Sequence, residues 1–170
     1  RQATREQLLF ALSTASSNAT IPVTMRTLTD KLGVSKAIAG FGVPLGATIN
    51  MSGSAIYITL AAMFAANISG TPIPMGDLFT VGVTVLLMSV GVGGVPGGAV
   101  VMAGVLLHQM GLPIEAMAIV MAVDRINDMF CTASNVVGDT AVNTIVAQLE
   151  GNPQEEDAYP EPIAVSAKQR

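Results

Sequence analysis

Several residue types that soluble enzymes and binding domains rely on are scarce in this sequence of 170 residues. It contains no tryptophan, one cysteine and one histidine, and only 12% of its residues are charged. The lone Cys131 cannot form an intrachain disulfide, and no paired cysteine or histidine spacing predicts a structural zinc site. Ser16 and Ser17 have no sequence-linked histidine and aspartate, so we predict that the protein is not an enzyme. Aromatic residues make up 4% and no basic patch contains them, which leaves nucleic-acid binding with little support.

Hydrophobic residues are abundant instead. They make up 51% of the chain, and the mean hydropathy is positive, which is typical of a membrane protein. The apolar runs between Phe41 and Gln148 are as long as segments that cross a bilayer. Only six charged residues lie between them: Asp77, Glu115, Asp124, Arg125, Asp128 and Asp139.

The two ends of the chain are polar. Residues 152–170 form an acidic tail that contains Glu155, Glu156, Asp157 and Glu161, a composition typical of a solvated end. The chain starts at Arg1, and residues 1–12 lack the apolar core of a signal peptide. We expect the sequence to be a fragment of a longer protein.

The segment from Asp124 to Asp139 is the most informative one. It places four charged side chains on an otherwise apolar stretch long enough to cross a bilayer. An aspartate or arginine near the centre of an inserted helix costs about 2.5 to 3.5 kcal/mol on insertion scales, so such residues mark functional sites. Binding a cation and a polar solute would offset that cost.

Breaks inside the apolar segments are the second signal. The long apolar run 37–67 is interrupted at residues 50–54, and a glycine-rich stretch at 91–98 divides the run 78–107. Residues 13–21 are rich in small hydroxyl residues and lead into Pro22, which makes a poor helix interior. We predict half-helices that meet at two tips, with Pro22 at the first tip and Pro96 at the second.

Two parallel units emerge from this pattern. In each, a broken segment with a proline precedes a long helix with an Asn-x-x-Gly motif, at Asn50 to Gly53 and at Asn135 to Gly138. Paired interrupted segments in corresponding halves indicate the binding site of a secondary transporter. The basic residues Arg26, Lys31 and Lys36 lie in the first linker, which we therefore expect to be cytoplasmic.

Four motifs in order resemble the dicarboxylate/amino acid:cation symporter family, the glutamate transporter homologues. They are the serine-rich first hairpin with Thr20-Ile21-Pro22, the motif PLGATINMSG at 44–53, the tip GVPGG at 94–98 and the pattern from Asp128 to Asp139. The resemblance covers about residues 6–151.

The resemblance implies an all-α membrane protein with two re-entrant helical hairpins and two long interrupted transmembrane helices in an inverted repeat. Residues 1–151 would be the core of an elevator-type transport domain, without the scaffold domain. Its parts would be hairpin 1 (about 6–25), helix 7 (about 37–68), hairpin 2 (about 77–110) and helix 8 (about 113–149).

By the same resemblance, Asp128 would hold the amino group of a substrate, and Asn135 with Ser16 and Ser17 would hold its carboxylate. Thr132, Ser54 and Val95 would also face the substrate. Acidic-amino-acid carriers have an arginine where this chain has Cys131, or alternatively at Ala15. Without a guanidinium, a second substrate carboxylate would be buried unpaired.

We therefore expect a small neutral amino acid such as serine, alanine, threonine or cysteine, with Cys131 in the site. An acidic amino acid or C4-dicarboxylate is the alternative, because Arg125 lies three residues before Asp128 and can reach the same side of the helix.

For the coupling ion, the resemblance implies two sodium sites. The first would use Gly46, Asn50, Asn135 and Asp139, and the second would use Thr48, Ser89, Val90 and Val92, mainly through backbone oxygens, which hard cations prefer. Ser52 stands where a third site usually has an aspartate, which argues against a third sodium ion.

The family further implies a multi-pass protein of the plasma (inner) membrane, a cytoplasmic C-terminal tail and a homotrimer formed through the absent scaffold. Two other classes stay open. An ion channel or proton-coupled carrier would use the same intramembrane carboxylates, and a truncated or structural membrane domain would bind solute without moving it.

Overall fold

The computed structural model describes residues 3–152, so the acidic residues of the predicted tail lie outside the described range. Every regular element within that range is helical, which confirms the all-α class. In chain order the elements are α1 (Arg5–Thr14), α2 (Ser17–Arg26), the π-helical turn η1 (Thr27–Lys31), α3 (Lys36–Ile49), α4 (Ser52–Ile68), the 3₁₀ turn η2 (Met75–Asp77), α5 (Leu78–Val90), α6 (Gly98–Gln109) and α7 (Ala116–Leu149).

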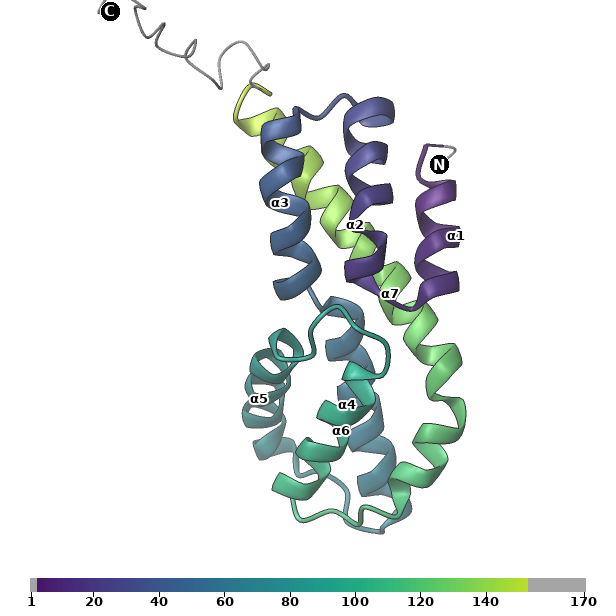
Figure 1. Cartoon of the computed structure of the whole chain (residues 1–170). Coiled ribbons are helices and arrows are strands. Elements are labelled where there is room, and N and C mark those ends of the chain that lie inside the picture. The colour runs from purple at the N-terminus through teal and green to yellow at the C-terminus, as the bar shows by residue number, and fades with distance from the viewer. Residues whose placement is uncertain (1–2, 153–170) are drawn as a thin grey trace, which may run out of the picture.

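Helix α7 runs along the whole described molecule and joins its two halves (Figure 1). Helices α1, α2 and α3 pack beside its C-terminal part, and α4 and α6 pack beside its N-terminal part. The link between α3 and α4, the link between α1 and α2 and the link between α5 and α6 all lie near the middle (Figure 1). Three breaks in helical structure therefore meet beside one continuous helix.

The outer surface is strongly apolar. In the described range, Lys36–Ile68, which comprises α3 and α4, is the one helical stretch long and apolar enough to cross a membrane by length and composition. Large apolar side chains such as Phe41, Phe79, Leu87 and Phe130 are exposed. Exposed apolar surface on this scale fits contact with lipid or with further protein.

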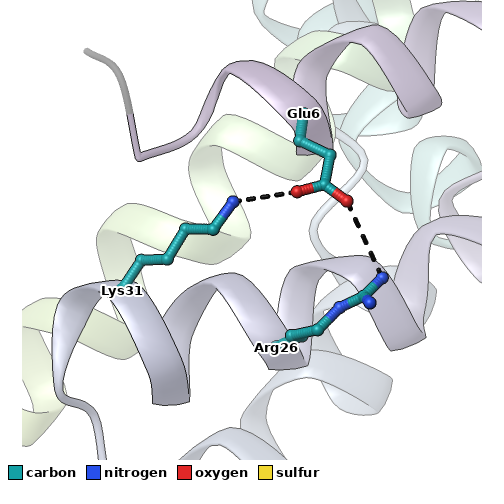
Figure 2. Close-up of polar contacts among 3 residues, drawn as sticks. All are labelled: Glu6, Arg26 and Lys31. Carbon is teal, nitrogen blue, oxygen red and sulfur yellow. Dashed lines mark hydrogen bonds and ion pairs between the residues drawn. The ribbon is translucent and has the colours of Figure 1, made fainter.

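Ion pairs connect the N-terminal end of α1 with the C-terminal end of α2 and with η1. Glu6 lies between the two cations, 2.9 Å from Lys31 Nζ and 3.8 Å from the guanidinium of Arg26 (Figure 2). The hydrogen bond from Lys31 and the nearby positive charges hold the pKa of Glu6 below its usual value. All three side chains are exposed, so their contribution to stability is small.

Two details of the predicted breaks are wrong. Pro22 does not lie at the first tip, because the chain turns at Ala15, whose φ is 48°, and Ser16 then caps α2 by accepting the Ala19 N–H at 3.2 Å. Pro22 lies inside α2.

The last long helix is not interrupted either, since α7 is continuous over 34 residues. Its Asn135 and Asp139 side chains bond to groups at the break between α3 and α4 and leave the α7 backbone ladder intact. The two Asn-x-x-Gly motifs therefore have different structures.

Candidate functional site

The break between α3 and α4 is held by side chains of α7. Asn50 ends α3 and its Nδ2 donates to Asp139 Oδ1 at 2.9 Å and to the carbonyl of Asn135 at 3.3 Å. At the start of α4, the Gly53 N–H donates to Asn135 Oδ1 at 2.8 Å. The polar groups freed by the break are thus satisfied across the helix interface, as buried backbone groups require.

Asp139 is a buried carboxylate without a cationic partner. It is 2% exposed, and no lysine or arginine of the described residues forms an ion pair with it. Gly46 provides the room for it, because a methyl group at Gly46 would overlap Asp139 Oδ1. A buried negative charge that has only amide donors beside it is the arrangement expected of a cation site.

The two tips meet each other and α7. Ser16 Oγ donates to the carbonyl of Gly94 at 2.7 Å, and the Asn18 N–H donates to the same oxygen at 3.1 Å. The Gly97 N–H, at the start of α6, donates to Asp128 Oδ2 at 2.8 Å. Gly97 has a φ of 79°, which favours glycine at this position. A backbone N–H therefore bonds to one of the two carboxylate oxygens of Asp128, the residue predicted to hold an ammonium group.

The predicted substrate residues differ in their placement. Six of them are buried at the first tip, at the start of α4 or along α7: Ser16, Ser17, Ser54, Asp128, Thr132 and Asn135. Asn135 Nδ2 lies 3.5 Å from Ser54 Oγ and 3.3 Å from Met51 Sδ. Cys131 is half-buried and packs against the apolar cluster around Tyr57, whereas Val95 is 53% exposed at the second tip.

The residues predicted for a second sodium site do not converge through their side chains. Thr48 Oγ1 donates to the carbonyl of Pro44 at 3.1 Å, and Ser89 Oγ donates to the carbonyl of Leu86 at 2.8 Å. Val92 is buried in the apolar cluster. Helices α3 and α5 contact each other and meet at their C-terminal ends (Figure 1). Two helix C-termini present carbonyl oxygens and partial negative charge, which suits a cation.

Three polar features were not predicted from the sequence. The Gly97 N–H that bonds to Asp128 is a backbone group, so no residue type in the sequence indicates this contact. Tyr57 donates its hydroxyl to Asp124 Oδ1 at 2.9 Å, a pairing between distant segments. Asn143 was detectable, because it lies four residues after Asp139 and so repeats on the same face of α7.

The sequence of this chain is similar to the sequences of known proteins. Residues 2–149 match the Sodium:dicarboxylate symporter family. Excitatory amino acid transporter 4 of Mus musculus is 38% identical over 144 residues, which are 85% of this chain and 26% of that protein. Excitatory amino acid transporter 2 of Mus musculus is 42% identical over 141 residues, or 83% of this chain and 25% of that protein.

A third relative is similar to the same extent. An Excitatory amino acid transporter of Caenorhabditis elegans is 42% identical over 131 residues, or 77% of this chain and 26% of that protein. The chain therefore spans about a quarter of the length of the curated relatives that it matches.

Proposed function

The chain belongs to the sodium:dicarboxylate symporter family, and on this premise we propose that it is the core of the moving domain of a sodium-coupled transporter for a small neutral amino acid. The family consists of membrane transporters and not of enzymes. The leading substrates are serine, alanine, threonine and cysteine, moved by symport or by exchange. The observation that carries the proposal is the buried Asp139 beside a broken helix, together with a tip region that lacks a cationic side chain.

Sodium coupling is supported by the oxygen atoms around the break. Asp139, Asn135 and Asn50 would hold one sodium ion, with the backbone of Gly46 opposite, and the ion would supply the positive charge that Asp139 lacks. The C-terminal carbonyls of α3 and α5, near Thr48 and at Ser89, Val90 and Val92, would hold a second. Ser52 is exposed and carries no charge, which argues against a third ion at this point.

A zwitterionic solute fits the region between the tips. Asp128 would accept its ammonium group once the Gly97 amide moves away. The N-terminal ends of α2 and α6 carry partial positive charge, and with Ser16, Ser17 and Asn135 they suit a single carboxylate. Thr132, Cys131, Ser54 and Val95 would surround the side chain.

The neutral substrate is supported by Cys131 and Ala15, which stand at the two positions where the resemblance would place an arginine. Arg125 is exposed and forms no ion pair with a described residue. Cys131 offers a small, weakly polar surface in place of a guanidinium. An acidic amino acid is the second candidate, because the relatives are named excitatory amino acid transporters and because Arg125 lies on the same helix as Asp128.

The architecture that we propose is an elevator. The pairs α1–α2 and α5–α6 would be two re-entrant hairpins of an inverted repeat, and residues 1–151 would slide as one transport domain. A scaffold from the remainder of the parent protein would hold a homotrimer in the plasma (inner) membrane, with the C-terminal tail in the cytoplasm. The chain alone would bind solute without moving it.

The test uses the full-length parent protein in liposomes. Labelled serine is supplied with sodium outside, and unlabelled alanine or aspartate is added in competition. We expect uptake that depends on sodium and is blocked by alanine but not by aspartate. Strong competition by aspartate would reject the neutral substrate, and uptake driven by a pH gradient alone would reject sodium coupling.

One variant tests the cation site directly. Asp139→Asn removes the buried charge, so sodium-driven uptake should be lost. Asp77→Asn is the control, because Asp77 is an exposed carboxylate far from the break along the chain. Wild-type sodium dependence in the Asp139 variant would reject the assignment of this carboxylate.

A further inference from the structure

A row of threonines runs along α2 into the start of η1. Thr20, Thr24 and Thr27 are spaced by four and three residues, so they lie on one face of the helix. Each of them is at most 1% exposed, and α2 and η1 both contact α7. Buried hydroxyl groups need hydrogen-bond partners. Thr20 has one, because its Oγ1 donates to the carbonyl of Ser16 at 2.8 Å.

Gln7 of α1 joins this row to α7. Its Nε2 donates to Thr24 Oγ1 at 3.1 Å and to Thr140 Oγ1 at 2.7 Å, so both hydrogens of the amide group are used. Its Oε1 can only accept, and it has no hydrogen-bond partner among the described residues. The side chain is 1% exposed. A buried amide oxygen without a donor lowers stability, so this one needs an explanation.

Thr27 Oγ1 is in the same situation. Within residues 3–152 it and Gln7 Oε1 are the two buried side-chain oxygen or nitrogen atoms without a partner. Thr27 lies one turn after Thr24, whose hydroxyl bonds to the amide of Gln7, so both unpaired atoms belong to one region. Thr27 also begins the π-helical turn η1, a backbone form that is rare and often occurs at functional positions.

A cavity of about 470 Å³ between α1 and α7 reaches this region. Gln7, Thr140 and Thr144 are among its polar lining residues. Thr4 and Gln148 line it as well, next to the N-terminal end of α1 and near the C-terminal end of α7. The cavity therefore leads from the polar end of the described molecule to the amide of Gln7.

We propose that a buried water site lies between α1, η1 and α7, where one water molecule donates to both Gln7 Oε1 and Thr27 Oγ1. Water has two donor hydrogens, and the two unpaired atoms are an amide oxygen and a hydroxyl oxygen that can each accept one. Buried waters in proteins bond to polar groups that are otherwise unsatisfied. A cation fits less well, because an amide and a hydroxyl bring no negative charge to offset its lost hydration.

The replacement of Thr27 by valine separates a water site from an unpaired hydroxyl. Valine is similar in size to threonine and lacks only the hydroxyl group. If a water bonds to Thr27, the replacement removes one partner of that water and lowers stability. If the hydroxyl were unpaired, the replacement would raise stability, because it removes a buried polar group that has no partner.

The experiment measures the melting temperature of the purified full-length protein in detergent. We expect Thr27→Val to lower it by about 2 °C or more. In a Gln7→Met background the same substitution should leave it unchanged or raise it, because neither polar atom then needs the water. Thr84→Val is the matched control, since Thr84 Oγ1 bonds to the carbonyl of Thr80 within α5 at 2.8 Å. It should change the melting temperature by less than about 1 °C in both backgrounds.

Three results would overturn the proposal. They are a higher melting temperature in Thr27→Val, equal effects of this substitution in both backgrounds, and an effect that disappears when choline chloride replaces sodium chloride, which would indicate a cation. If the variants do not fold, a high-resolution experimental structure of the wild type decides. Solvent density within hydrogen-bond distance of both atoms supports the water site, and a direct bond between Gln7 and Thr27 rejects it. None of these outcomes depends on which solute or ion is transported.

Discussion

Cys131 is the residue on which the choice of substrate depends. It lies three residues after Asp128 on α7, so the two side chains are neighbours on one face. Its half-buried thiol packs against the apolar cluster around Tyr57, where a small side chain fits. A guanidinium at this position would bring a fixed fork of donors close to the carboxylate of Asp128 and to any solute beside it.

We expect Cys131→Arg to change the preference from neutral to acidic amino acids. A hydrogen bond to a charged group contributes about 1.5–3 kcal/mol, so the ratio of aspartate to serine uptake should rise about ten- to a hundredfold. Competition uptake in liposomes measures that ratio. Cys131→Ser, similar in size and uncharged, is the matched control, and an unchanged ratio in the arginine variant would place the selectivity elsewhere.

At the scale of elements, the start of α4 after the break depends on one side chain of α7. The Gly53 N–H has Asn135 Oδ1 as its acceptor, and the packing is close, since a methyl group at Gly53 would overlap the backbone of Cys131. No other group of the described residues accepts from this N–H. Removing the acceptor would leave a buried donor unpaired.

Asn135→Leu should therefore destabilise the protein by about 1–3 kcal/mol, the cost of an unsatisfied buried polar group. Denaturation of the purified protein in the absence of sodium and amino acid measures this change without any contribution from ligand binding. Asn67→Ala, at the exposed end of α4, should change the free energy of unfolding by less than about 0.5 kcal/mol. Equal effects of the two substitutions would show that Asn135 does not hold the break.

The sequence predicted that two apolar runs are interrupted, because glycine, proline and asparagine fall inside them. The breaks at Asn50 and at Gly91 to Gly98 were found in this way. The sequence did not predict that α7 is continuous, because residues 135–138 have the same Asn-x-x-Gly pattern as residues 50–53, where a helix does break. Whether such a motif interrupts its helix depends on whether a neighbouring helix supplies hydrogen-bond partners for the freed backbone groups. That is decided by the tertiary structure.

The same reasoning explains what was missed in the site. Asp128 and Asp139 were singled out because charged side chains are rare in an apolar helix, and Asn135 was assigned by the resemblance to the family. The Gly97 amide that reaches Asp128 is a backbone group, and its position follows only from the folded loop.

At the scale of the whole molecule, the two halves touch through their tips over the proposed site. The carbonyl of Gly94 accepts hydrogen bonds from both Ser16 and Asn18, and the Gly97 N–H donates to one carboxylate oxygen of Asp128. These contacts close the space that an amino acid would enter. In the proposed site, the ammonium group of the solute would take the Asp128 oxygen that the Gly97 N–H now bonds to, so we expect the second tip to move before the solute binds.

A cross-link between the tips tests this requirement. Asn18 and Val95 are both exposed, and the Asn18 N–H bonds to the residue next to Val95, so cysteines at these two positions lie close together. In a full-length Cys131→Ser background, oxidation of the Asn18→Cys, Val95→Cys variant should reduce amino acid uptake in liposomes at least tenfold, to about the level without sodium, and reduction should restore it. Each single-cysteine variant should be insensitive to oxidation. Uptake at the background rate by fully cross-linked protein would mean that the solute enters without separation of the tips, and the Gly97 contact with Asp128 would then have no part in the path of the substrate.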